Sequence, residues 1–388
     1  MQIGFDGAFP HRVIQGPETI SRLGVLLSTH HLTHVGVLMD TGISESGIGA
    51  IVTASLEAEA IPYTVIDDLS REPTDVDVER VIARLADLDV DAIVAVGGGS
   101  VLDIGKVCAC LTDDSISIVD LLEGGTLPPH TRFTTLIPTT SGTGAEATKN
   151  AIFAIPSRKT KFAVVHENLL PDLVILDPEL TVTMPSAITA TTGMDALCHA
   201  MECYLSQKAN VMSDLYALEA IRLIARSLRS ATFDPTNRQA RSDLQIAAYW
   251  AGTCITLSGT NAVHALSYPL GTLYHIPHGH SNAILLPHVM EKNLPALPEK
   301  AASIARCFGY EERGSGQAVT GYIGGELHRL VEDLEINTSL SAFGVTEEAV
   351  AELVEIAYNN RRLMDNNPVD LSKDEIEEIY HRLLRNGE

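Results

Sequence analysis

The chain has 388 residues, of which 45% are hydrophobic, enough to bury the cores of about two or three domains. Its 27 Lys and Arg against 50 Asp and Glu give a formal charge of −23, which repels phosphate backbones and argues against nucleic-acid binding. No apolar run reaches the roughly 18 residues of a membrane span, and the first residues do not resemble a signal peptide. We therefore expect a cytoplasmic protein that binds neither nucleic acid nor membrane.

Short apolar runs rich in β-branched residues alternate with amphipathic segments in the first half of the chain. The runs lie at residues 35–39, 61–66, 92–96, 133–137 and 173–176. This alternation is typical of a parallel β-sheet covered by helices.

Beyond Pro185 the apolar residues recur at three and four positions, as at Leu215, Leu218 and Ile221, which predicts helices. We therefore expect two domains: an α/β domain over residues 1–183 and an all-helical domain over residues 184–388, with the functional site in a cleft between them. The six cysteines form no C-x-x-C pair, so we expect reduced and mostly buried thiols.

A glycine-rich turn follows the 92–96 run, in the segment DAIVAVGGGSVLDIGK. Glycines permit close approach of the backbone, and the N–H groups at the start of the following helix attract phosphate. The residues placed closest to a phosphate are Gly98, Gly99 and Ser100. Because the spacing is not G-x-G-x-x-G, the sequence is equally compatible with phosphate binding and with a simple tight turn.

Two further features follow strand-like runs. Asp40 ends the 35–39 run, where a carboxylate can accept hydrogen bonds from a ribose 2′-hydroxyl and repel a 2′-phosphate; a solvated turn or a helix N-cap is the alternative. The loop PTTSGTGAEAT follows the 133–137 run and offers the hydroxyl groups of Thr139, Thr140, Ser141 and Thr143. Two such loops at strand ends suggest one shared ligand.

Five of the 14 histidines lie within 25 residues, at His264, His275, His278, His280 and His288. Upstream, Asp195 and His199 are four residues apart in a helical pattern, so their side chains leave the same face. One carboxylate and up to three imidazoles suit Fe²⁺, Zn²⁺, Co²⁺ or Mn²⁺. The alternative is a local hydrogen bond within the helix, with the later histidines in turns and core. Spacing alone does not choose among His275, His278 and His280 as the last ligand.

Six segments together resemble the iron-containing (group III) alcohol dehydrogenase family over essentially the whole chain. They occur in the family's order, as GGGSVLDIGK, PTTSGTGAEAT, LLPDLVILDPELT, GMDALCHAMECYLS, NAVHALSYPLG and PHGHSNAILLPHVM. The resemblance implies a Rossmann-like dinucleotide-binding domain followed by a helical metal-binding domain, the fold shared with dehydroquinate synthases. It also implies a set of metal ligands, namely Asp195, His199, His264 and His278.

The resemblance assigns cofactor contacts as well, to Asp40, Gly97, Gly98, Gly99, Ser100, Asp103, Thr139, Thr140, Thr143 and Lys161. For Asp103, direct contact with the cofactor has an equal alternative: an acid in the first turn of a helix interacts favourably with the helix dipole. Many relatives carry a second histidine four residues after the one at His264, where this chain has Tyr268, a poorer proton relay near neutrality. His275 or His280 could take that role, and Asn150 is a candidate for holding a substrate hydroxyl.

These expectations describe an NAD(H)-linked alcohol dehydrogenase or aldehyde reductase. It would act on small primary alcohols or short hydroxyaldehydes, with Fe²⁺, or alternatively Zn²⁺ or another divalent metal, polarising the substrate oxygen during hydride transfer. We expect NAD(H) in preference to NADP(H), and a homodimer or larger homo-oligomer. The alternatives are a metal-dependent lyase of the dehydroquinate synthase type that uses NAD transiently, a maleylacetate reductase-like enzyme, and a non-catalytic scaffold.

Overall fold

The computed structural model describes residues 4–69, 73–112, 116–156, 160–311 and 316–385. The chain divides into two compact units, here called the sheet unit and the helical unit. The sheet unit comprises Ala8–Thr140 and Gly144–Thr183; the helical unit comprises the stretch up to Gly7, Ser141–Thr143 and the chain from Met184 onward. The chain passes from the sheet unit to the helical unit after Thr183, and Ser141–Thr143 belongs with the helical unit.

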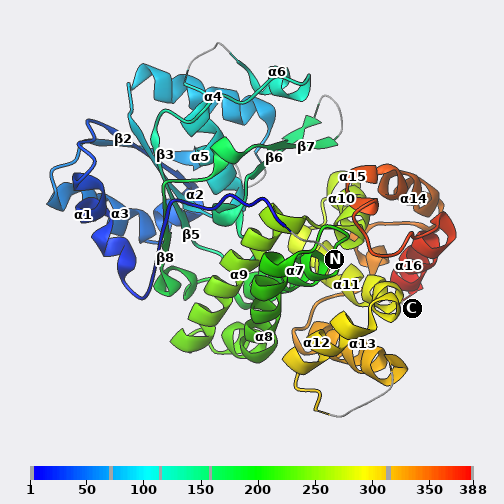
Figure 1. Cartoon of the computed structure of the whole chain (residues 1–388). Coiled ribbons are helices and arrows are strands. Elements are labelled where there is room, and N and C mark those ends of the chain that lie inside the picture. The colour runs from blue at the N-terminus through cyan, green and yellow to red at the C-terminus, as the bar shows by residue number, and fades with distance from the viewer. Residues whose placement is uncertain (1–3, 70–72, 113–115, 157–159, 312–315, 386–388) are drawn as a thin grey trace. The chain divides into compact units, whose positions relative to one another are not determined.

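The sheet unit is built on a parallel six-stranded sheet with the order β1-β8-β5-β4-β2-β3 (Figure 1). This confirms the predicted parallel sheet. The strands are β1 (Arg12–Gln15), β2 (Val35–Asp40), β3 (Tyr63–Leu69), β4 (Ala92–Gly97), β5 (Phe133–Pro138) and β8 (Leu173–Leu176). A separate antiparallel hairpin joins β6 (Asn150–Ile155) to β7 (Thr160–Val165).

Helices cover both faces of the six-stranded sheet, which explains why its central strands are continuous apolar runs. Alternate residues of β4 belong to different cores: Ile93 packs in the core that contains α4 and α5, and Val94 in the core that contains α1 and α3. The helices of this unit are α1 (Leu23–Ser28), α2 (Thr41–Glu45), α3 (Ile48–Ala58), α4 (Asp75–Asp87), α5 (Gly99–Cys110) and α6 (Ile118–Leu122). At Gly105 of α5, a Cβ atom would lie 2.6 Å from the Cβ of Ala95, so this glycine lets α5 pack directly against β4.

The helical unit has one continuous hydrophobic core. Its helices are α7 (Ser186–Leu205), α8 (Val211–Phe233), α9 (Arg238–Ser258), α10 (Ala262–Tyr274), α11 (His278–Asn293), α12 (Pro298–Cys307), α13 (Gly316–Asp333), α14 (Val350–Asn359), α15 (Arg361–Met364) and α16 (Lys373–Arg385). This confirms the all-helical second half predicted from the sequence. In the described parts of the chain, no helix combines the length and the apolar character needed to cross a bilayer.

All six cysteines lie among the described residues and form no disulfide. Five are buried and Cys307 is partly buried. Burial raises the pKa of Cys108 and of Cys110 to about 12, so both remain protonated thiols at neutral pH.

A buried ionic cluster ties α5 to the loop and hairpin that follow β5. The Nζ of Lys106 lies 2.7 Å from Oδ1 of Asp103 and donates hydrogen bonds to the carbonyl oxygens of Ala145 (2.9 Å) and Asn150. The other oxygen of Asp103 accepts a hydrogen bond of 2.9 Å from the backbone N–H of Ile152 in β6. The glycine-turn segment therefore also carries side chains that hold the hairpin in place.

Glu146 lies beside this cluster in the 3₁₀ turn Ala145–Ala147 and is 2% exposed. Burial raises the pKa of its carboxyl group from 4.5 to about 7, because desolvation outweighs the attraction of Lys106. The folded chain therefore binds this proton more tightly than the unfolded chain does.

We predict that Glu146→Gln removes a pH-dependent loss of stability. In the wild type the contribution of Glu146 is fully present below the unfolded pKa of 4.5 and is lost as the pH rises through the folded pKa of about 7. Relative to wild type, the variant should gain roughly 2 to 3 kcal/mol in free energy of unfolding between pH 5 and pH 8. Urea denaturation at both pH values measures this difference.

The matched control is Glu45→Gln, which changes an exposed glutamate on α2. Its stability relative to wild type should be the same at pH 5 and pH 8. A Glu146→Gln variant that also behaves in this way would contradict the assignment.

Candidate metal centre and cofactor loops

Helix α7 carries the first two predicted ligands. Asp195 and His199 lie one turn apart on its buried face, with exposed fractions of 2% and 4%. Oδ1 of Asp195 lies 3.8 Å from Nε2 of His199. The four-residue spacing thus places both polar groups at one point inside an otherwise apolar helix bundle.

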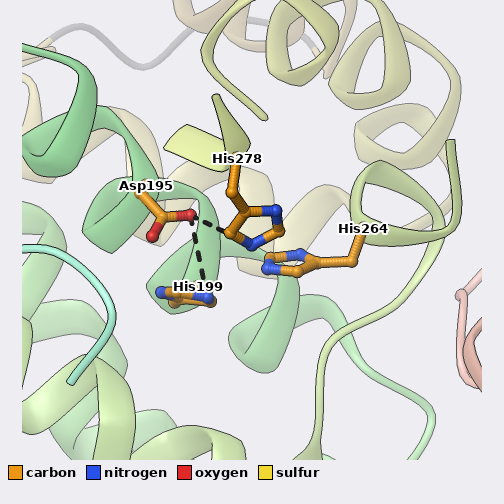
Figure 2. Close-up of side chains that lie close together, drawn as sticks. All are labelled: Asp195, His199, His264 and His278. Atoms are coloured by element: carbon orange, nitrogen blue, oxygen red, sulfur yellow. Dashed lines mark ion pairs between the residues drawn. The ribbon is translucent and has the colours of Figure 1, made fainter. Parts of the chain in front are cut away.

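Two further helices of the same unit supply the other predicted ligands. His264 lies in the first turn of α10, and His278 is the first residue of α11. Each of the four residues offers one ligand atom, and these atoms all lie within 4.8 Å of one another (Figure 2). The Nε2 of His278 is 3.7 Å from the same Asp195 oxygen that faces His199. The structure therefore brings together all four ligands that the resemblance implies.

Gly279 permits the close approach of α11 to α7. A Cβ atom at this position would lie 2.5 Å from the backbone oxygen of Thr191 and 3.4 Å from the Cβ of Asp195. Any larger residue would push the start of α11 away from α7, and His278 with it. This contact gives a physical reason for the PHG sequence at this helix start.

Glu202 is a site residue that the sequence analysis missed. It lies on α7, is fully buried, and accepts hydrogen bonds from Nδ1 of His264 and from the backbone N–H of Val263 (2.6 Å). A carboxylate that accepts from Nδ1–H fixes the tautomer of the imidazole, so the Nε2 lone pair of His264 is directed at the cluster. In the sequence, the one feature that points to a role for Glu202 in the site is its position three residues after His199, on the same face of the helix.

The amide of Asn282 marks the point where the ligand atoms converge. Its Nδ2 lies 2.7 Å from Oδ1 of Asp195, 3.2 Å from Nε2 of His278 and 3.3 Å from Nε2 of His264. One donor group thus faces the lone pairs of three ligands at once. One carboxylate and three imidazoles without a thiolate are a donor set that fits Fe²⁺, Zn²⁺ or a similar divalent cation.

The electrostatics of the cluster favour the protonation states that bind metal. Burial opposes the ionisation of Asp195, but the neighbouring imidazoles and the Asn282 amide outweigh burial and hold the pKa of this carboxyl below its usual value. Burial lowers the pKa of His199, which keeps that ring neutral at neutral pH. A carboxylate and a neutral imidazole are the forms required of ligands.

The remaining aromatic and histidine candidates lie at different distances from this cluster. The ring of Tyr268, on α10, is 6.1 Å from the His278 ring, and burial raises its pKa, which makes it a still poorer proton relay. His275 caps the end of α10 with a positive φ of 54° and is exposed. His280 donates from Nε2 to the carbonyl oxygen of Asn337 (2.7 Å) and packs its ring against Phe343.

The predicted cofactor loops follow three adjacent strands. Asp40 ends β2, Gly97 ends β4 and Thr139 follows β5, and in a parallel sheet the carboxyl ends of neighbouring strands lie at the same edge. The backbone N–H of Thr139 donates to the carbonyl of Gly97 (3.0 Å), and a Cβ at Gly98 would lie 3.7 Å from Thr140. Chain order reverses between β2 and β4, and open α/β sheets bind their ligands at such a point.

The start of α5 at this edge lacks a side-chain cap. Its N-cap is Gly98, and Gly99 and Ser100 begin the helix. Asp40 is itself an N-cap, because its Oδ1 accepts a hydrogen bond of 3.1 Å from the backbone N–H of Ile43. Its carboxylate therefore has a structural partner whether or not it also contacts a ribose.

The other cofactor and substrate candidates lie on several different elements of the chain. The carboxylate of Asp103 is engaged by Lys106 and Ile152, as described above. Thr143 belongs with the helical unit, and Lys161 lies in β7 opposite Ala154. Asn150 begins β6, and its backbone oxygen accepts from Lys106.

Family models match both halves of the chain. Residues 10–178 match the model described as iron-containing alcohol dehydrogenase, and residues 189–384 match the C-terminal model of the Fe-containing alcohol dehydrogenase family. The chain belongs to the iron-containing alcohol dehydrogenase family. This alcohol dehydrogenase is an oxidoreductase that acts on CH–OH groups, in a family that uses NAD and iron or another divalent metal.

Its relatives include enzymes with different alcohols in their names. It is 38% identical to long-chain-alcohol dehydrogenase 1 of Geobacillus thermodenitrificans, over 89% of this chain and 88% of that protein. It is 34% identical to 1,3-propanediol dehydrogenase of Klebsiella pneumoniae, over 97% of this chain and 98% of that protein.

Solved structures match the alcohol dehydrogenase over nearly its full length. A crystal structure of 1,3-propanediol oxidoreductase superposes with a TM-score of 0.91 at 34% identity, covering 98% of this chain and 100% of that one. Sulfoacetaldehyde reductase from Bifidobacterium kashiwanohense, solved in complex with NAD⁺, has a TM-score of 0.90 at 28% identity, covering 98% and 99% of the two chains.

We predict that Glu202→Gln weakens divalent metal binding by about 10- to 100-fold, because a neutral amide no longer holds the His264 tautomer as a carboxylate does. Competition with a chromogenic chelator measures the affinity. Glu219→Gln on α8, which removes a partly exposed partner of Arg222, is the matched control and should bind metal as the wild type does. Equal affinities for both variants would contradict the role assigned to Glu202.

Proposed function

We propose that the chain is an NAD(H)-linked alcohol dehydrogenase or aldehyde reductase for small primary alcohols and short hydroxyaldehydes. Asp195, His199, His264 and His278 hold its divalent cation, for which we propose Fe²⁺. The observation that carries this proposal is the convergence of the four ligand atoms within 4.8 Å. The relative named for 1,3-propanediol supports a short substrate. Because another relative is named for long-chain alcohols, the carbon-chain length of the preferred alcohol is the first property to measure.

Each part of the site has a defined task in this proposal. A bound divalent cation supplies Lewis-acid polarisation of an alcohol or aldehyde oxygen, and the nicotinamide supplies or accepts the hydride. Glu202 keeps the Nδ1 proton on His264 and so keeps Nε2 available as a ligand. The surrounding apolar residues of α7, α10 and α11 exclude water, which strengthens the electrostatic interactions within the cluster.

The proton released from an alcohol needs a path to solvent. Tyr268 lies beside His278, but its raised pKa makes it a hydrogen-bond donor that orients the substrate oxygen. We therefore assign proton exchange to solvent, with the exposed His275 at the end of α10 as the residue of this segment that passes the proton on.

The cofactor part of the proposal places the pyrophosphate of NAD(H) at the start of α5. Gly97, Gly98, Gly99 and Ser100 offer close backbone approach, and the Thr139 and Thr140 hydroxyls lie on the neighbouring loop. Asp40, with Asp103, Thr143 and Lys161, completes the set of proposed contacts. Asp40 favours NAD(H) because its charge repels the 2′-phosphate of NADP(H). For the assembly we propose a homodimer or larger homo-oligomer, on the family resemblance alone.

We predict that His264→Ala abolishes metal retention and turnover together, because the remaining three ligands lose the imidazole that Glu202 orients. The measurements are metal content after dialysis and the reduction of NAD⁺ with a panel of primary alcohols of increasing chain length. His381→Ala, at a partly buried histidine of α16 in the same unit, is the control. Full metal occupancy in His264→Ala would remove His264 from the ligand set. Turnover without net change in NADH absorbance would instead indicate a lyase.

The cofactor preference gives a second prediction for this function. The wild type should have a higher kcat/KM with NADH than with NADPH, and Asp40→Asn should narrow the difference, since asparagine keeps the N-cap but lacks the charge. Asp67→Asn, at an exposed aspartate of β3, should leave the preference unchanged. A wild-type preference for NADPH would overturn the role of Asp40.

A further inference from the structure

A second group of ligating side chains lies on the far part of α11, outside the four-residue cluster. His288 and Glu291 are three residues apart on this helix, and His328 belongs to α13. Each offers one ligand atom, and the three atoms lie within 4.8 Å of one another. The proposed dehydrogenase reaction uses none of these residues.

His288 is the buried member of the group. Its residue is 8% exposed, and its Nδ1 is buried without a hydrogen-bond partner. A buried polar atom without a hydrogen-bond partner destabilises the folded state, so its presence in a well-packed helix requires a reason. Burial also lowers the pKa of His288 to about 4, which leaves the ring neutral and its lone pair available at neutral pH.

Glu291 and His328 complete the group from its exposed side. Nε2 of His328 lies 3.3 Å from Oε1 of Glu291, and the rings of His328 and His288 are 5.2 Å apart in an edge-on arrangement. The side chains of His328 and Glu291 are 48% and 38% exposed, so both can move by the small distance needed to reach metal–ligand bond lengths of about 2 Å.

Arg382 is the one cation in contact with this group among the described residues. Its Nη1 lies 3.0 Å from Oε2 of Glu291, and its Nη2 lies 2.7 Å from Glu378. The guanidinium therefore holds the Glu291 oxygen opposite to the one that faces His328. One carboxylate can bind a cation through one oxygen and accept a hydrogen bond through the other, an arrangement that orients ligating carboxylates in metal sites.

We propose that His288, Glu291 and His328 form a second metal site, which binds Zn²⁺ or a similar divalent transition-metal ion. Two imidazoles and one carboxylate are a donor set that zinc uses in proteins, with water in the fourth position. The bound ion joins α11 to α13, and Arg382 of α16 holds Glu291 through the carboxylate oxygen that faces away from His328. A chain with both sites filled then holds two metal ions, of which only one lies at the Asp195–His278 centre. Zinc in excess of one ion per chain belongs to the second site.

The experiment measures Zn²⁺ binding to the full chain after treatment with a chelator. Equilibrium dialysis against increasing free Zn²⁺ should give about one fewer bound ion per chain for His328→Gln than for the wild type. The control is His381→Gln, which changes a partly buried histidine that contacts two glutamates, Glu347 and Glu377. This variant should bind as many ions as the wild type. Equal zinc content in wild type and His328→Gln would overturn the proposal.

Thermal unfolding gives an independent measurement. Zn²⁺ stabilises whatever folded state it binds, so it should raise the Tm of the wild type and of His381→Gln by more than that of His328→Gln. The same rise in all three proteins would also overturn the proposal. Both measurements compare variants that share an unchanged Asp195–His278 centre, so they are independent of the identity of its metal and of the substrate.

Discussion

The helical unit depends on placing one carboxylate and three imidazoles, all buried except the partly exposed His278, at the meeting point of α7, α10 and α11. Polar groups are costly inside an apolar bundle unless each has a partner, and here the partners are one another, together with the Glu202 carboxylate and the Asn282 amide. The hydrophobic core of this unit holds the helices in place, so Asp195, His199 and His264 stay buried, whereas the His278 side chain is partly exposed. The close placement of these polar groups inside an apolar bundle is costly for folding, but it also arranges them around one point where a cation can bind.

Much of the fold could be predicted from local sequence, because the central strands are buried on both faces and appear as unbroken apolar runs. Strand β1 has the sequence RVIQ and is mostly exposed at the edge of the sheet, so it lacks that pattern. The β6–β7 hairpin lacks that pattern too, since β6 alternates buried and partly buried residues and its position depends on Lys106 of a helix distant in sequence.

For the metal site, too, part can be predicted from local sequence and part depends on residues that are far apart in the chain. Helical spacing alone predicts that Asp195 and His199 share one face of a helix, whereas His264 and His278 lie on other helices, and the assignment of all four as ligands comes from the family resemblance. Glu202 was missed because an acid in a helix has many ordinary roles; only the fold places it against His264. For the cofactor loops, the sequence does not show which strands are neighbours. The strand order of the sheet shows that Asp40 and the glycine turn flank the place where chain order reverses.

The hydrogen bond between Glu202 and His264 has a consequence for how the site is loaded. Both groups are buried, and Glu202 also accepts from the backbone of α10, so the orientation of the ring is set by the protein and not by the ion. Uptake of a cation then requires little rearrangement of the helices. The choice among divalent ions is then a matter of ligand chemistry and metal supply, because the helices already hold the imidazole in its ligating orientation.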